Sequence, residues 1–156
     1  MLRRISALVL LVVILLWSSV GVWAQPGGGP VLVLEVDGVI NPLTARYLDR
    51  SLQLAEQRGA RLVVVMLDTP GGLDGSMREM VQSLLGAPVP TAVYVAPSGA
   101  RAASAGMFIT LAGDIAAMAP ATNIGAASPV ALGGEPGDTE IAKATSDAAA
   151  LARSIA

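Results

Sequence analysis

The stretch RLVVVMLDTPGG, residues 61–72, joins an uninterrupted apolar run to a turn that is rich in glycine. The run contains three consecutive valines and no polar alternation, which is typical of a strand buried on both faces of a parallel sheet. Ligands bind such sheets outside the carboxyl ends of their strands. The turn therefore lies where a site is expected, and Gly71 and Gly72 let a ligand approach the main chain closely. Taken alone, the same residues also fit a plain Pro-Gly turn before a helix.

Segments typical of strands and helices alternate on both sides of this run. Apolar runs predict the strands, and apolar residues at helical spacing predict the helices. The first helix is expected to begin with Asn41 as its cap and Pro42 in its first turn. This alternation predicts an α/β fold with a largely parallel sheet. The predicted strands are 31–36, 61–67, 90–96 and 114–120, the helices are 41–60, 74–87, 100–113 and 138–156, and a loop covers 121–137.

The N-terminus has the plan of a secretory signal. Arg3 and Arg4 precede an uncharged run from Ile5 to Ala24, and the residues around Ala24 suit a cleavage site. The alternative is an uncleaved membrane anchor, because the run is about as long as the roughly 20 residues that span a bilayer. In either case the rest of the chain is expected on the extracytoplasmic side of the membrane. Residues 25–30 read as a linker, and 31–156 as one folded domain.

The composition excludes several classes of function. The chain has no cysteine and no histidine, so a metal site built from these residues and thiol chemistry are both excluded. It carries 10 basic and 12 acidic side chains, and removal of Arg3 and Arg4 leaves only 8 basic ones. Because no basic patch remains, nucleic acid is not an expected partner. No cofactor and no metal ion is predicted.

A serine with small neighbours follows the third predicted strand, in the stretch SGARAASAG, residues 98–106. Ala103, Ala105 and Gly106 leave the hydroxyl of Ser104 open to a substrate carbonyl. A position near a helix N-terminus also offers free N–H groups to an oxyanion. The alternative is tight packing of a buried helix of small residues. Ser98 is a weaker candidate, because its proline and glycine neighbours make it a turn residue.

A serine nucleophile needs an adjacent base, and the chain has no histidine to supply one. A Ser-His-Asp triad is therefore impossible, but a Ser-Lys pair is a known variant of this arrangement. Lys143 is the only lysine in the chain, and its flanks are mostly small or apolar. The alternative is a solvated lysine on a helix surface, paired with Asp147 four residues further on.

Four motifs occur in a fixed order, and together they are more specific than any one of them. They are DTPGG at 68–72, SGARAASAGMFITLAGD at 98–114, MAPATNIGAASPV at 118–130 and KATSDAAA at 143–150. This combination resembles the extracytoplasmic serine protease domain of the NfeD family, the stomatin-operon membrane proteases, which belongs to the ClpP/crotonase superfamily. The resemblance runs from about Val31 to the last residue. It implies a ClpP-like spiral of strand-strand-helix units, which this chain is expected to contain incompletely, without the closing strand and helix.

The resemblance also assigns roles to residues. It implies Ser104 as nucleophile, Lys143 as base and Asp147 as a structural residue. The implied oxyanion donors are Gly71, Gly72 and Ala105. Members of the family cleave apolar segments of membrane-associated proteins of the stomatin group. The expected function is therefore a membrane-associated endopeptidase that acts on apolar peptides or stomatin-like proteins and assembles as a homodimer or larger homo-oligomer.

Two other functions stay open. A crotonase-like acyl-CoA enzyme would share an oxyanion hole made of two N–H groups, but it would add an acidic residue near the hole and act in the cytosol. A non-catalytic membrane scaffold would keep the site only as a relic.

The segment 121–137 is expected to be a mobile lid, because a loop of this length without structure of its own is uncommon unless it is functional. It would order over an apolar peptide and bring Lys143 to Ser104. Apolar side chains are expected near the scissile bond, from Met107, Phe108 and Leu132.

Overall fold

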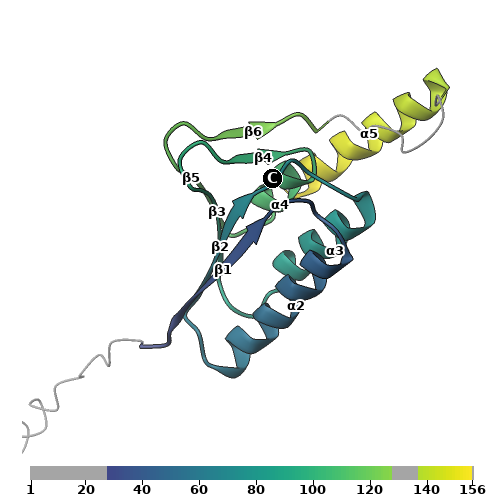
Figure 1. Ribbon diagram of the computed structural model, residues 1–156. Helices are drawn as coiled ribbons and strands as arrows, with labels where there is room; N and C mark the ends of the chain where they lie inside the picture. The colour runs from purple at the N-terminus through teal and green to yellow at the C-terminus, as the bar shows by residue number, and fades with distance from the viewer. Residues whose placement is uncertain (1–27, 128–136, 156) are drawn as a thin grey trace, which may run out of the picture.

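The computed structural model describes residues 28–127 and 137–155 and shows an α/β fold (Figure 1). Four parallel strands form the main sheet in the order β1-β2-β3-β5. These strands are β1 (Val31–Asp37), β2 (Leu62–Asp68), β3 (Thr91–Val95) and β5 (Ile115–Met118). The helices are α2 (Pro42–Gln57), α3 (Asp74–Leu85), α4 (Ala105–Leu111) and α5 (Asp138–Ile155). The predicted α/β class with a parallel sheet is confirmed.

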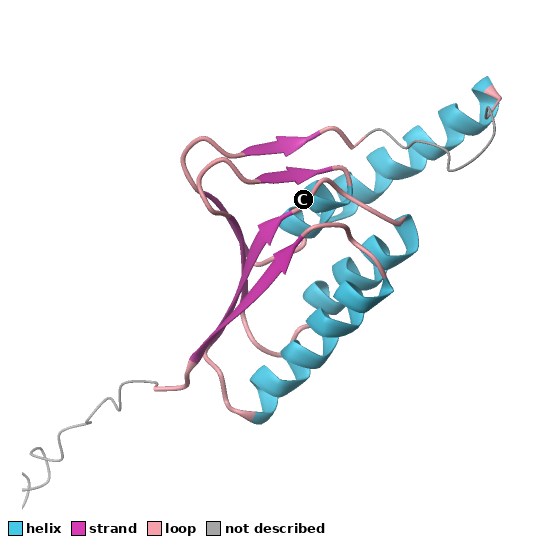
Figure 2. Cartoon of the chain, viewed as in Figure 1, coloured by secondary structure: helices cyan, strands magenta, loops and turns pink. Residues whose placement is uncertain are grey.

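The apolar run of β2 is fully buried on one face only. Val63, Val65 and Leu67 have no exposed surface, whereas the alternating residues Leu62, Val64 and Met66 are half-buried. Figure 2 shows α2 and α3 on the same side of the sheet, and their buried side chains join the core that these strands form. The prediction of burial on both faces is therefore wrong, because the residues on the second face of β2 keep part of their surface exposed.

A second layer of short strands lies beyond the carboxyl ends of the main sheet. It contains β4 (Arg101–Ala103) and β6 (Asn123–Gly125), which pair in parallel, and single bridges join Ile40 to Gly72 and Thr69 to Ala102. Each long strand is thus followed by a short extended piece and then by a helix. This is the strand-strand-helix repeat that the sequence resemblance implies.

Two predicted segments need correction. The helix predicted from residue 100 begins only at Ala105, because Arg101–Ala103 pairs with β6, and this tertiary pairing outweighs the helix preference of alanine. The segment predicted as a loop from residue 121 contains β6, which has three residues. The rest of the predicted lid, residues 128–136 with Leu132, lies outside the described residues, as do the predicted signal or anchor and residues 25–27 of the linker.

The start of α2 agrees with the prediction and helps to place the site. Asn41 Oδ1 accepts the N–H of Thr44 at 3.2 Å, and Thr44 Oγ1 accepts the N–H of Asn41 at 2.9 Å, a reciprocal capping box. The residue before the cap, Ile40, donates its N–H to the carbonyl of Gly71 at 2.9 Å. It also accepts the N–H of Leu73 at 3.0 Å. The capped helix start therefore holds the Pro-Gly-Gly turn from one side.

Within residues 28–127 and 137–155, none of the helices combines the length and the hydropathy that crossing a bilayer requires.

Candidate active site

Ser104 sits at the junction of β4 and α4 in a backbone conformation that few residues other than glycine adopt. Its φ is 50° and its ψ is −114°, and its N–H donates to the carbonyl of Gly125 on β6 at 2.8 Å. A non-glycine residue in such a region costs of order 1–3 kcal/mol, and residues of this kind cluster at functional sites. A sharp strand-to-helix turn of this kind presents a serine hydroxyl at the surface of the fold. The side chain of Ser104 is half-buried.

The Pro-Gly-Gly turn that follows β2 lies directly against this serine. Gly71 has a φ of +109°, and a Cβ atom added there would lie 2.6 Å from Ser104 Cβ and 3.1 Å from Ser104 Oγ. Glycine is thus required at position 71 both by the backbone angle and by the space. At Gly72 an added Cβ would lie 2.0 Å from the carbonyl oxygen of Ile40. The structure therefore brings the two motifs quoted from the sequence into contact.

The three N–H groups assigned by the resemblance to the oxyanion hole differ in their bonding. The N–H of Gly71 donates to Thr69 Oγ1 at 3.0 Å, so it is already engaged. The N–H groups of Gly72 and Ala105 have no acceptor among the residues that the structure describes. Both residues line the same pocket as Ser104. The arrangement therefore offers two free donors beside the serine, from Gly72 and Ala105, and not three.

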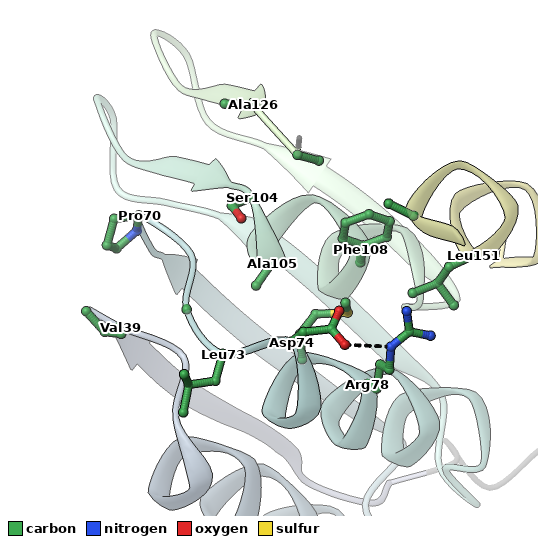
Figure 3. A pocket seen from close by; sticks show the side chains of 14 residues that line it. Val39, Pro70, Leu73, Asp74, Arg78, Ser104, Ala105, Phe108, Ala126 and Leu151 are labelled. Carbon is green, nitrogen blue, oxygen red and sulfur yellow. Dashed lines mark hydrogen bonds and ion pairs between the residues drawn. The ribbon is translucent and has the colours of Figure 1, made fainter. Parts of the chain in front are cut away.

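The pocket has a volume of about 580 Å³ and is mainly apolar (Figure 3). This size lies within the range of small-molecule and peptide sites. Its walls come from α3, α4, the residues after β6 and the C-terminal half of α5, and Phe108 and Leu151 flank the side away from the serine in Figure 3. The lining residues are Val39, Pro70, Gly72, Leu73, Asp74, Met77, Arg78, Ser104, Ala105, Phe108, Ala126, Ala127, Ala148 and Leu151.

A charged cluster closes the pocket on the side of α3 and α5. Arg78 Nε donates to Asp74 Oδ2 at 2.9 Å, and Arg78 Nη2 donates to Asp147 Oδ2 on α5. The hydrogen bond to Asp74 and the two carboxylates raise the pKa of Arg78 above its ordinary value. The guanidinium therefore stays charged and joins the two helices. Asp147 pairs with Arg78, and the alternative pairing with Lys143 does not occur among the described residues.

Lys143 lies on α5 but does not line the pocket. Its side chain is exposed, and within the described residues it forms no ion pair. Residues of α5 pack against the core from Ala148 onward, whereas 139–147 are exposed. Figure 1 shows the N-terminal half of this helix projecting away from the rest of the chain. The structure thus brings Ser104, Gly71, Gly72 and Ala105 together and leaves Lys143 outside that group.

Ser98 lies apart from the pocket. Its Oγ donates to the carbonyl of Pro120 at 2.7 Å, and the side chain is exposed in a turn. This agrees with its interpretation as a turn residue.

Two residues that the sequence analysis passed over support the site. Thr69 is fully buried, and its main chain bonds to β4 on both sides, through Arg101 O at 2.7 Å and the N–H of Ala103 at 3.1 Å. Asp68 Oδ1 accepts the N–H of Arg101 at 3.0 Å. A signal was present in the sequence, since Asp and Thr before Pro-Gly commonly bond to nearby main chain. The partners on β4, however, become neighbours only in the fold.

No group of three or more Asp, Glu, His or Cys side chains that could hold a metal ion occurs in the described part of the chain.

Comparison with known proteins adds a family. Residues 30–153 match the family model described as NfeD1b, N-terminal domain. The membrane-bound protease PH1510 of Pyrococcus horikoshii is 42% identical over 100 residues, which are 64% of this chain and 23% of that protein. The membrane protein NfeD1b of Bacillus subtilis is 36% identical over 98 residues, which are 63% of this chain and 22% of that protein. The chain thus spans less than a quarter of the length of these curated relatives.

Solved structures agree with this match. A serine-to-alanine variant of 1510-N, a membrane-bound stomatin-specific protease, superposes with a TM-score of 0.71 at 34% identity, covering 80% of this chain and 63% of that chain. A lysine-to-alanine variant of 1510-N in complex with a substrate peptide gives 0.64 at 41% identity, covering 65% and 47%. A ClpP1 variant from Listeria monocytogenes gives 0.59 at 19% identity, covering 79% and 67%. The last likeness shows the fold alone, which is ClpP-like.

Proposed function

Because the chain belongs to the family of NfeD1b N-terminal domains, we propose that it is part of a membrane-associated serine endopeptidase and carries its nucleophile. The observation that supports this most strongly is the setting of Ser104. A strained serine stands next to two free N–H groups, from Gly72 and Ala105, at an apolar pocket. Preorganised donors of this kind stabilise the charge of a tetrahedral intermediate, and each is worth about 3 kcal/mol of barrier.

In this mechanism, Ser104 Oγ attacks the scissile carbonyl and forms an acyl-enzyme. Lys143 accepts the hydroxyl proton and then donates it to the leaving amine. Water then hydrolyses the acyl-enzyme and releases Ser104. Since Lys143 is exposed on α5 and outside the pocket, the mechanism requires Lys143 to move toward Ser104 when substrate binds. We infer that the projecting half of α5 is the moving part.

We propose that the substrate is an apolar segment of a membrane-associated protein of the stomatin group. The lining of the pocket supports an apolar substrate, since it includes the side chains of Pro70, Phe108, Ala126 and Leu151. Two findings on relatives support the class: one is called a membrane-bound protease, and 1510-N is called specific for a stomatin homologue. We further propose a location on the extracytoplasmic side of the membrane and a homodimer or larger homo-oligomer.

An active-site-directed fluorophosphonate is the sharpest test of this function. It should label Ser104 covalently in the purified full chain, and Ser104→Ala should abolish labelling without unfolding the domain. Ser98→Ala is the matched control, because this serine is exposed and lies outside the pocket. Equal labelling of the wild type and Ser104→Ala would refute the nucleophile assignment.

One observation favours a second function, a crotonase-like acyl-CoA enzyme. Asp74 lines the pocket that holds the two free N–H groups, and an acidic residue in that place is what such an enzyme uses as acid or base. Against this, Asp74 is paired with Arg78 at 2.9 Å, so its carboxylate is already engaged. The fluorophosphonate also separates these cases, because an acyl-CoA enzyme of this type needs no serine nucleophile.

A further inference from the structure

We propose that Thr69 is the positioning residue that sets the two halves of the oxyanion hole relative to each other, an inference that rests on the proposed protease function. The two free donors come from different parts of the chain: Gly72 follows β2, and Ala105 begins α4. A hole made of such donors works only if the distance between them is fixed. Thr69 is the residue that contacts both parts.

The hydroxyl of Thr69 holds the glycine turn. Thr69 Oγ1 accepts the N–H of Gly71 at 3.0 Å and donates to the carbonyl oxygen of Gly71 at 3.3 Å. Both bonds are fully buried, so water cannot replace the hydroxyl as a partner. The N–H of Gly71 is thereby turned toward Thr69, and the next N–H, that of Gly72, is left free in the pocket.

The methyl group of Thr69 holds the start of α4. A Cβ atom added to Gly106 would lie 2.6 Å from Thr69 Cγ2, so the first turn of the helix is seated directly on this methyl group. Gly106 is the second residue of α4 and follows Ala105, the other donor. Because a β-branched side chain is stiff at χ1, the positions of its methyl group and its hydroxyl are linked.

The main chain of Thr69 completes the connection. Its N–H donates to Arg101 O at 2.7 Å, and its carbonyl accepts the N–H of Ala103 at 3.1 Å. These bonds fix the short strand that leads into Ser104. One fully buried residue therefore contacts the glycine turn, the strand before the nucleophile and the helix after it.

The test separates the hydroxyl from the methyl group. Thr69→Val keeps the branched shape and removes the hydroxyl, whereas Thr69→Ser keeps the hydroxyl. We expect Thr69→Val to lower the rate of fluorophosphonate labelling of Ser104, and kcat on an apolar fluorogenic peptide, by about 10- to 100-fold with KM nearly unchanged, because small misplacements cost this much. Thr69→Ser should recover most of kcat. The Gly71 amide proton resonance should move upfield in Thr69→Val and stay in place in Thr69→Ser.

Thr91→Val is the matched control. Thr91 is also fully buried, and its hydroxyl bonds to Asp114, far from the pocket lining. This variant should lower the melting temperature and leave kcat unchanged. If Thr69 had only a structural role, Thr69→Val would show this same pattern. If Thr69→Val does not fold, Thr69→Ala takes its place, since it removes the hydroxyl without adding bulk.

Several results would overturn the inference. Wild-type kcat in Thr69→Val, or an equal loss in Thr69→Ser, would remove the role of the hydroxyl. An unmoved Gly71 resonance would do the same without any measurement of activity. The proposed protease function is tested separately, by labelling of Ser104. If the wild type is labelled and Ser104→Ala is not, that function stands even when the results on Thr69 contradict its positioning role. Absence of labelling in the wild type would overturn both.

Discussion

At the scale of single residues, the site depends on a contact between a glycine and a serine that are far apart in the chain. Gly71 can adopt its φ of +109° because it has no side chain, and Ser104 occupies the space that a side chain would need. The positive φ and the lack of space are two independent reasons for a glycine at position 71. They predict different effects of substitution, one on stability and one on the nucleophile.

The substitution Gly71→Ala tests both reasons at once. We expect it to destabilise the fold by about 1–3 kcal/mol, since alanine is strained at positive φ, and also to abolish activity, since its methyl group would displace Ser104. Gly38→Ala is the matched control, because Gly38 has a φ of +99° and nothing within 4 Å of an added Cβ. Urea unfolding should give similar losses of stability, while peptide cleavage should be lost only in Gly71→Ala. Full activity of Gly71→Ala would contradict the observed contact.

The role of Lys143 can be separated from its charge. Arginine keeps the positive charge but cannot act as a base, because it stays protonated at any pH that the protein tolerates. We therefore expect Lys143→Arg to be as inactive as Lys143→Ala when acylation is followed by a single-turnover measurement. Substantial activity of the arginine variant would instead make Lys143 a partner in an ion pair.

Part of the site was predictable at this scale, and the reason is chemical. Small residues around Ser104 and the Gly-Gly pair are unusual enough in sequence to mark a close approach of main chain to ligand. The role of Thr69 was not predictable, because it depends on contacts with Gly106 and β4 that arise only in the fold. The engagement of the Gly71 N–H is different, because Thr69 lies only two residues away and a threonine before Pro-Gly commonly makes such a local bond.

At the scale of elements, the long strands and helices follow their sequence patterns, and the short strands do not. The predicted strand at 61–67 and the helix start at Asn41 agree with the structure, since burial and capping are local signals. The strand β4 consists of Arg101, Ala102 and Ala103, which carry no strand preference of their own. It is a strand because β6 and Thr69 supply partners, and such non-local pairing leaves no periodicity to read.

The helix α5 is attached at one end only, which gives a prediction for its ion pair. Asp147 and Arg78 join α5 to α3 just before the residues of α5 that pack on the core. We expect Asp147→Asn to speed amide hydrogen exchange in 148–155. The loss in the free energy of opening this part of the helix should be at most about 1 kcal/mol, because the ion pair is largely exposed. Glu140→Gln is the control, since Glu140 is exposed on the projecting half of the same helix. Unchanged exchange in Asp147→Asn would show that apolar packing alone holds the helix.

At the scale of the whole molecule, the sheet separates two regions with different tasks. The short strands β4 and β6 lie beyond the carboxyl ends of the main strands (Figure 1). Ser104 directly follows β4 and lines the pocket. At the opposite edge, where β3 and β5 begin, the polar contacts serve stability. There Asp114 Oδ2 accepts the N–H of Thr91 at 2.7 Å and the hydroxyl of Thr91 at 3.0 Å. This separation predicts that contacts at the amino ends of the strands affect the stability of the whole domain and leave peptide cleavage unchanged.

Asp114 gives that prediction a sign in pH. The hydrogen bond from the Thr91 main chain, followed by that from its hydroxyl, lowers the pKa of Asp114 below its ordinary value of 3.8. A carboxyl group with a depressed pKa in the folded state adds stability that is fully present above the ordinary pKa and is lost as the pH falls through the folded-state pKa. We therefore expect Asp114→Asn to lower the free energy of unfolding at pH 7, and the difference from the wild type to shrink steadily below about pH 3.8. Urea unfolding of both proteins between pH 7 and pH 2.5 measures this difference.

Because Asp114 is exposed, the effect on the free energy of unfolding is small, and the test is whether it is smaller at pH 2.5 than at pH 7. A difference that stays constant with pH would mean that the loss comes from the shape of the side chain and not from its charge. Peptide cleavage at pH 7 should be equal in the two proteins, since Asp114 lies at the edge of the sheet away from Ser104.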